Sequence, residues 1–163
     1  MIRAVRPVFV AVMVLAVSLS ACSSGQPSTF SLAGASVDST HWCPGGSHDA
    51  PYDVHATIDA RNATSSAVTI ESMTASMTLA ATTGTWIEKI GDRYEADKVQ
   101  FSPPTVAPGA TTKLAVTFPS SCTSGAYNAG TSSQGDYVVT MHVVTSAGQY
   151  SIAASNRHSI VAA

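Results

Sequence analysis

Apolar and polar side chains alternate strictly from residue 52 to residue 61, as in a strand with one buried and one wet face. The apolar positions are Tyr52, Val54, Ala56, Ile58 and Ala60. The same alternation returns at residues 113–118, and residues 137–145 and 149–155 predict a hairpin around a short turn. These segments predict antiparallel strands that are each buried on one side.

Residues 67–81 alternate as well, but the phase of the pattern changes near Glu71 and Ser72. Val68 and Ile70 are apolar at even positions, whereas the later apolar residues stand at odd positions: Met73, Ala75, Met77 and Leu79. A slip of one residue turns a strand's side chains to the opposite face. The slip therefore predicts a β-bulge, or a turn between two strands.

Proline and glycine mark the connections between the strands. We expect a first strand within residues 29–40, loops at 41–51 and 119–135, and turns at Pro103-Pro104 and Pro108-Gly109. The chain thus predicts seven or eight short strands at about ten-residue spacing, with at most one short helix. This outline is typical of an all-β, antiparallel β-sandwich.

The segment at residues 84–98 breaks the pattern, because seven of its fifteen residues are charged in a chain that is 11% charged. Within it Trp86, Ile90 and Tyr94 recur every four residues. The favoured interpretation is a short amphipathic helix that packs this stripe against the sandwich. In the alternative, Trp86 and Tyr94 are exposed anchors for a protein partner.

The amino terminus has the pattern of a secretory signal: Arg3 and Arg6, then ten apolar residues at 8–17, then small residues. Ten residues of helix rise about 15 Å, which is too short to span a bilayer. The tetrad that follows, Leu19-Ser20-Ala21-Cys22, resembles the lipobox of bacterial lipoproteins.

The resemblance implies cleavage before Cys22, a diacylglyceryl thioether on its sulfur, and N-acylation by a fatty acid such as palmitate. It divides the chain into a signal peptide (1–21), a flexible tether (22–29) and a domain (30–163). Two acyl chains suffice for stable anchoring. By the same resemblance Ser23 favours the outer membrane in a bacterium that has one. The alternative is an ordinary secretory signal in which Cys22 is incidental.

Cys43 and Cys122 are the other two cysteines, 79 positions apart. Outside the cytoplasm such an isolated pair predicts one disulfide, since no Cys-x-x-Cys motif points to metal or redox chemistry. A loop of this length corresponds to about 4–5 kcal/mol in the chain-entropy account, as an upper figure.

Residues 101–118 and 135–150 resemble the later strands of immunoglobulin-like domains on bacterial surface proteins: a Pro-Gly turn precedes one core strand, and Gly-Asp-Tyr opens another. The resemblance covers about residues 52–155 and implies an immunoglobulin-like sandwich, with no activity attached. In antibody-type domains the bridging cysteines lie within facing strands. Here both fall in predicted loops, so we expect the bridge to pin loops at one end of the sandwich.

Charge and motifs exclude several classes of function. Removal of Arg3 and Arg6 with the signal leaves six Lys and Arg against ten Asp and Glu, a formal charge of −4. This predicts no binding to nucleic acid. The neighbours Ser47, His48 and Asp49 cannot converge as a triad, and no Gly-x-Ser-x-Gly occurs, so we predict no enzyme and no cofactor.

A zinc or copper site is the rival interpretation. Asp53, His55 and Asp59 share the wet face of one strand, and His41 and His48 lie in the adjoining loop. The softer ligands Met73 and Met77 fit the core better. His142 is expected to be half-buried at the edge of the core. Asn62-Ala63-Thr64 matches the glycosylation pattern, but a bacterial signal argues against its modification.

The sequence therefore predicts a monomeric lipoprotein outside the cytoplasm, anchored to the cell membrane, that acts as a non-catalytic binding or envelope-interaction module. A protein of the envelope is the expected partner, bound by loops at one end or by Trp86 and Tyr94. An extracytoplasmic carrier of copper or zinc is the alternative.

Overall fold

A computed structural model describes residues 29–44, 49–96, 98–122 and 132–162, which form eleven strands and no helix. The strands are β1 (Phe30–Val37), β2 (Thr40–Cys43), β3 (Pro51–Asn62), β4 (Val68–Thr83), β5 (Arg93–Ala96), β6 (Gln100–Ser102), β7 (Thr105–Val106), β8 (Thr111–Ser121), β9 (Ser133–Thr145), β10 (Gly148–Ala153) and β11 (His158–Ala162). The described part thus offers no helix that would be able to cross a membrane. Cys22, the predicted signal, most of the predicted tether and His48 lie outside the described residues.

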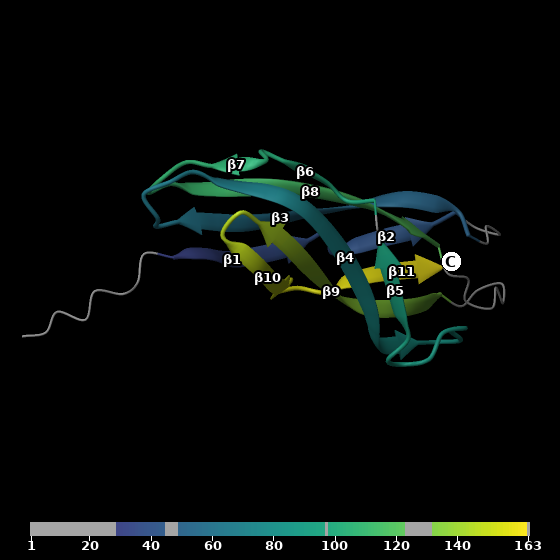
Figure 1. Ribbon diagram of the computed structural model, residues 1–163. Helices are drawn as coiled ribbons and strands as arrows, with labels where there is room; N and C mark the ends of the chain where they lie inside the picture. The colour runs from purple at the N-terminus through teal and green to yellow at the C-terminus, as the bar shows by residue number, and fades with distance from the viewer. Residues whose placement is uncertain (1–28, 45–48, 97, 123–131, 163) are drawn as a thin grey trace, which may run out of the picture.

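The strands form two layers (Figure 1). One sheet has the order β1-β3-β8-β6, and the other has the order β2-β11-β9-β4-β5, with β10 beside β9 and β7 beside β4. This confirms the predicted all-β fold class, an immunoglobulin-like sandwich, in which all the described strand pairs are antiparallel except the parallel pair of β2 and β11. The described strands outnumber the expected seven or eight because β2, β5, β6 and β7 are only two to four residues long, too short to show a clear alternation of apolar and polar positions.

The core fills the space between the inner faces of the two sheets. The alternation predicted for β3 is confirmed, with Val54 and Ile58 fully buried and His55 exposed. The slip predicted near Glu71 is a bulge, since the pairing of β4 with β9 shifts register between Ile70 and Ser72. The bulge turns the later odd positions inward, so Met73 and Met77 belong to the core.

The helix predicted within residues 84–98 is wrong. The segment instead completes a hairpin, in which Met77 pairs with Tyr94 and Thr78 with Arg93. The backbone N–H of Gly91 donates to the carbonyl of Leu79, whose own N–H donates to that of Asp92. Gly91 has φ 99°, a left-handed conformation that glycine adopts without strain. These cross-strand bonds compete with helical ones, so the four-residue recurrence does not define a common face.

The disulfide between Cys43 and Cys122 joins the two sheets, with a Cα–Cα distance of 5.7 Å. Cys43 is the last residue of β2 rather than a loop residue, and Cys122 directly follows β8. The bridge therefore lies at one end of the sandwich, as expected, although one of its cysteines belongs to a strand. We call this the disulfide end.

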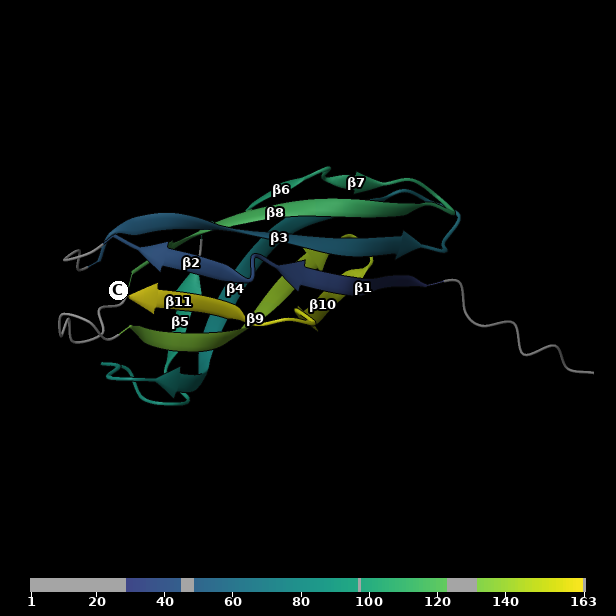
Figure 2. The same cartoon turned by 180° about the vertical axis from the view of Figure 1, so that it is seen from behind.

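Strand β1 begins at the opposite end of the molecule from the one where β2 and β11 end (Figures 1 and 2). The register of β3 shows this directly, because Pro51 pairs with Ser121 at the disulfide end while Asn62 pairs with Phe30. The 12 residues of β3 extend over about 40 Å at roughly 3.3 Å per residue. The first described strand thus starts far from the disulfide.

Replacing both bridging cysteines, Cys43→Ala with Cys122→Ala, is expected to lower the free energy of unfolding by about 2–4 kcal/mol, because the unfolded chain regains a long open loop. Urea denaturation of the oxidised wild type and the double variant measures the difference. A reductant should lower the wild type to the level of the variant and leave the variant unchanged. Equal midpoints in oxidising buffer would refute a stabilising bridge.

Candidate functional site

A cavity of about 190 Å³ opens at the disulfide end between the two sheets, and we call it the end cavity. Strands of both sheets contribute to it, together with the loop that joins β4 to β5. Its lining comprises Asp49, Met77, Glu88, Tyr94, Ser120, Ser121, Tyr137 and Ile160. The lining thus combines two acidic residues, two tyrosines and two serines with the apolar Met77 and Ile160.

Tyr94 closes one side of the end cavity. It stands opposite Met77 on the inner face of β5, an edge strand of its sheet. Its hydroxyl donates to the carbonyl of Pro119 in the other sheet at 3.1 Å, while 40% of the residue stays exposed. Tyr94 is therefore both a link between the layers and part of the surface.

Glu88 forms another wall, and its carboxylate is held by two donors. The hydroxyl of Tyr137 donates to it, and so does the indole N–H of Trp86 at 3.3 Å. The same indole N–H lies 3.2 Å from the oxygen of Tyr137. These contacts fix the carboxylate at the mouth of the sandwich.

Trp86 is partly buried and packs on the backbone of β9. A Cβ added to Gly135 would lie only 2.6 Å from Cε2 of the Trp86 ring, so the close approach requires glycine. Packing of Trp86 therefore occurs as predicted, but without a helix. Ile90 of the same predicted stripe is instead 67% exposed.

Residues 84–92, here the tip loop, present two apolar side chains to solvent. Ile87 is 65% exposed, and Ile90 projects similarly. The loop is nevertheless held in one conformation. The backbone N–H of Lys89 donates to the Asp92 carboxylate at 2.8 Å, and Gly91 and Asp92 form backbone hydrogen bonds with Leu79 of β4. Sequence reasoning missed Ile87 and Glu88, although both fall inside the segment whose composition stood out.

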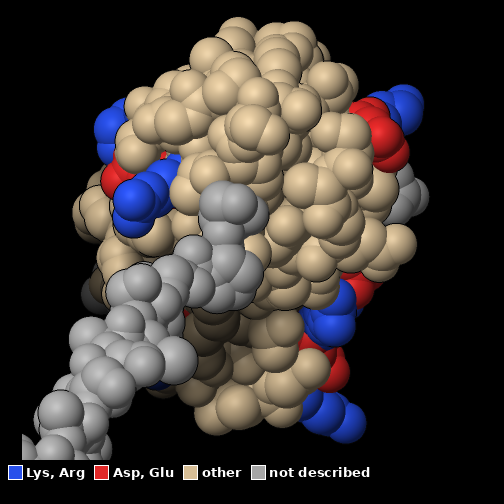
Figure 3. Space-filling model, turned by 60° about the vertical axis from the view of Figure 1, so that its left-hand side comes forward, with Lys and Arg blue, Asp and Glu red and all other residues tan. Residues whose placement is uncertain are grey.

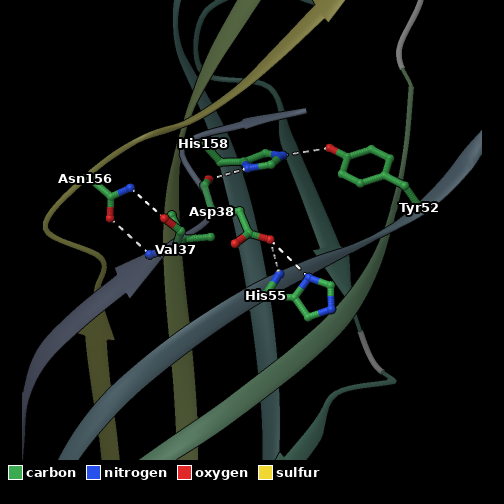
Figure 4. Close-up of polar contacts among 6 residues, drawn as sticks. All are labelled: Val37, Asp38, Tyr52, His55, Asn156 and His158. Carbon is green, nitrogen blue, oxygen red and sulfur yellow. Dashed lines mark hydrogen bonds and ion pairs between the residues drawn. The ribbon is translucent and has the colours of Figure 1, made fainter. Parts of the chain in front are cut away.

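A second polar group lies beside the end cavity, where the chain passes from β1 to β2 (Figure 4). The buried His158 lies with Nδ1 2.7 Å from the carbonyl oxygen of Asp38, so Nδ1–H must donate. Neutral His158 therefore accepts at Nε2 the hydroxyl proton of Tyr52, at 2.9 Å. Asn156 bonds both the N–H and the carbonyl of Val37 at 3.0 and 2.7 Å. These hydrogen bonds hold the backbone of Val37 and Asp38 in place, where the chain crosses from one sheet to the other.

Burial shifts the pKa values of Tyr52 and His158 in the directions that favour their neutral forms. Burial raises the pKa of Tyr52 to about 12, and the Glu88 and Tyr94 charges act in the same direction, against a hydrogen bond with Ser120. Burial lowers the pKa of His158, and also that of His41, whose ring stacks on Tyr52 at 3.6 Å. The network therefore works with a neutral imidazole and a protonated phenol.

The candidate metal ligands are not brought together. His55 Nδ1 lies 3.1 Å from the Asp38 carboxylate, and Asp59 pairs with Lys113 at 2.9 Å. Among the residues that the structure describes, no three His, Cys, Asp or Glu side chains are close enough to hold an ion. Asp53 remains exposed on the outer face of β3, whereas the candidate thioethers of Met73 and Met77 are buried in the core.

The remaining predicted positions have local roles. His142 is half-buried, but on the outer face of β9, opposite Thr74 and Ser151, rather than at the edge of the core. Asn62 is fully buried and its amide donates to the carbonyls of Ser66 and Val106, an arrangement that leaves no room for a glycan. In the described part of the triad-like stretch, the N–H of Asp49 donates to the carbonyl of Cys122.

The charged side chains of the face seen in Figure 3 lie at its margins, blue beside red, around a largely uncharged surface. This interspersed pattern forms no continuous positive area on that face. Lys113 with Asp59 and Arg93 with Glu95 are ion pairs of this kind.

Comparison with known proteins adds little. No family model and no curated protein matches the chain. A solved structure, the ASH / PapD-like domain of human CEP192 (PapD-like domain 7), is similar over 97% of this chain and 98% of that one, at 14% identity and a TM-score of 0.31. At so low a score, no conclusion about the activity of this chain rests on the likeness.

The buried His158 predicts a loss of stability in acid. Because its pKa is lowered in the folded state, the unfolded chain binds more protons once the pH falls below the ordinary value of 6.5. The free energy of unfolding is therefore complete above that pH and declines as the pH falls toward the lowered pKa. His41 adds to the decline in the same direction.

Urea unfolding at about pH 7.5 and about pH 5.5 tests this linkage. His158→Gln retains a donor and an acceptor but cannot take up the proton, so it should lose less stability between the two pH values than the wild type does. His41→Gln measures the share of the second histidine. An identical decline in His158→Gln and wild type would show that His158 is not the group responsible.

Proposed function

We propose that this protein is a lipid-anchored lipoprotein outside the cytoplasm, whose β-sandwich binds a protein of the cell envelope without catalysis. The observation that carries the proposal is the ordered tip loop, which exposes Ile87 and Ile90 beside the end cavity. Exposed apolar side chains on a fixed backbone lose little conformational entropy on binding, which favours association.

The direction in which the tip loop faces supports a partner away from the anchoring membrane. The lipobox-like tetrad implies attachment at Cys22, and the predicted tether reaches only about 15 Å. The tether precedes Phe30, whereas the tip loop lies at the disulfide end, about 40 Å away along β3. A domain held close to the bilayer by its Phe30 end would present the tip loop outward.

The make-up of the surface supports binding rather than chemistry. Trp86 and Tyr94 are of the residue types enriched at protein interfaces, and each is already held in place by packing or hydrogen bonds.

Anchoring is tested by replacing Cys22 with Ser in the native host. The wild type should fractionate with membranes and show an intact mass that begins at a diacylated Cys22, whereas Cys22→Ser should appear in the soluble fraction with no acyl mass. A wild type with an unmodified terminus would remove the anchoring part of the proposal.

Partner binding is tested by Ile87→Ser with Ile90→Ser. Crosslinking on intact cells should give a discrete adduct whose yield falls at least about tenfold in this variant, since truncating interface anchors costs more than about 1 kcal/mol each. Ala107→Ser with Ala147→Ser, exposed turn positions away from the disulfide end, is the matched control and should keep the adduct. Thermal melting must show both variants folded. Equal adducts in the two variants would place the interface elsewhere.

A further inference from the structure

We propose that residues 39–42, here the β2 flap, open reversibly in acid while the residues on either side of them stay fastened to the other sheet. The inference concerns a conformational device in the fold and does not depend on the partner of the proposed function. The flap contains three of the four residues of β2, the edge strand of the seven-stranded sheet. Among the described strands β2 pairs with β11 alone, so the flap can leave without disturbing any other pairing.

Fixed points bound the flap on both sides. Asp38, which precedes it, is bonded to β3: its N–H donates to the carbonyl of His55 at 2.9 Å, and its carboxylate accepts the backbone N–H of His55 at 2.9 Å (Figure 4). Cys43, which follows the flap, is joined to Cys122 by the disulfide. The four residues between these points can therefore swing outward and return to the same place.

Few contacts hold the flap closed. Three of its four side chains are exposed: Ser39, Thr40 and Trp42. His41 alone turns inward, and its ring stacks on that of Tyr52 with 3.6 Å between the ring centroids. The remaining contact is the backbone pairing with β11, in which the N–H of Ser159 donates to the flap at 2.9 Å. A titratable side chain thus makes the inward contact of the flap.

A second titratable group, His158, lies on β11 and is only 1% exposed. In its neutral form Nδ1–H donates to the carbonyl of Asp38, and Nε2 accepts the hydroxyl of Tyr52. A proton added at Nε2 would aim a second donor at that hydroxyl. The hydroxyl would then have to turn toward Ser120, and a positive charge would still be buried without water. Opening of the flap, which pairs with β11 next to His158, lets water reach the ring.

Titratable side chains face His158 from each neighbouring element: Asp38 before β2, His41 on β2, Tyr52 on β3 and Tyr137 on β9. Glu88 lies further out and accepts the hydroxyl of Tyr137. Burial lowers the pKa of His158, the carbonyl and charge of Asp38 raise it, and His41 lowers it further, with a net decrease. Burial also lowers the pKa of His41.

These directions fix the sign of the pH dependence. The closed flap is fully favoured above the ordinary histidine pKa of 6.5 and loses its advantage as the pH falls toward the lowered values. A histidine that takes up a proton only in the open state raises the open population by up to about tenfold between about pH 7.5 and pH 5.5. A charged His41 ring would still attract the face of Tyr52, which opposes opening. We therefore expect His158 to contribute the larger share.

Amide hydrogen exchange of the full chain, solubilised in detergent, tests the flap at about pH 7.5 and about pH 5.5. The reporters are the Ser159 N–H, which donates to Ser39, and the amides of the flap. After correction for intrinsic exchange rates, their protection should fall at least about threefold in acid. Low concentrations of urea should change it little, because a local opening exposes little surface. The amides between β4 and β9 should be better protected and should respond to urea.

Matched replacements assign the effect to the two histidines. His158→Gln should remove most of the acid response of the flap, and His41→Gln a smaller part. His142→Gln is the control, since His142 lies half-buried on the outer face of β9 and should leave the response as in the wild type. Thermal melting shows whether each variant is folded. If His158→Gln does not fold, the wild-type urea series and His41→Gln still decide.

Flap amides with the protection and urea response of the β4–β9 amides would overturn the proposal, because exchange would then require unfolding of the whole domain. Equal flap protection at the two pH values would also overturn it. So would an undiminished acid response in both His158→Gln and His41→Gln, or its loss in His142→Gln.

Discussion

The passage of the chain from one sheet to the other, between Val37 and Thr40, is the constraint on which the disulfide end depends. It places β2 parallel to β11, and so brings Cys43 within bonding distance of Cys122. His158 and Asn156 secure it by bonds to the backbone of Asp38 and Val37. The same imidazole holds Tyr52, whose neighbour across the strands, Ser120, lines the end cavity. A contact about 120 positions apart in the chain thus supports the candidate site.

Two sets of polar side chains lie at the disulfide end: the buried contacts of His158 and the lining of the end cavity. His158, Tyr52 and Asp38 form a closed set in which each donor has an acceptor, and among the described residues no buried side-chain nitrogen or oxygen lacks a partner. An interior built this way can exclude water without the cost of orphaned groups. The end cavity differs, because carboxylates and phenols there border open space. A rigid interior on one side and polar groups that line a cavity on the other would suit the proposed binding function.

The tip loop shows how an exposed apolar surface can be kept on a stable domain. Ile87 and Ile90 contribute little to the core, since most of their surface stays in water. Their loop is held instead by backbone bonds to Leu79 and by Trp86, which lies against Gly135. Stability and the proposed recognition would therefore rest on different residues of one short segment. A lipid anchor next to Phe30 would use the opposite end of the same strands, so that the length of β3 sets the distance between attachment and recognition.

By itself the sequence determined the longer strands, their buried faces and the change of phase near Glu71, because alternation along a strand directly reports which side chains leave water. The isolated pair of cysteines likewise predicted the bridge between Cys43 and Cys122. It also singled out residues 84–98, but assigned them a helix and gave Ile90 a buried place. Only the tertiary structure decided that Trp86 packs against Gly135, that Ile90 projects and that Tyr94 reaches the other sheet. The four-residue recurrence is a local signal, whereas the hairpin depends on pairing with β4 and on a glycine in β9 far along the chain. The end cavity was beyond prediction for the same reason: Asp49, Glu88 and Tyr137 come from three distant segments, and only the packing of two sheets brings them together.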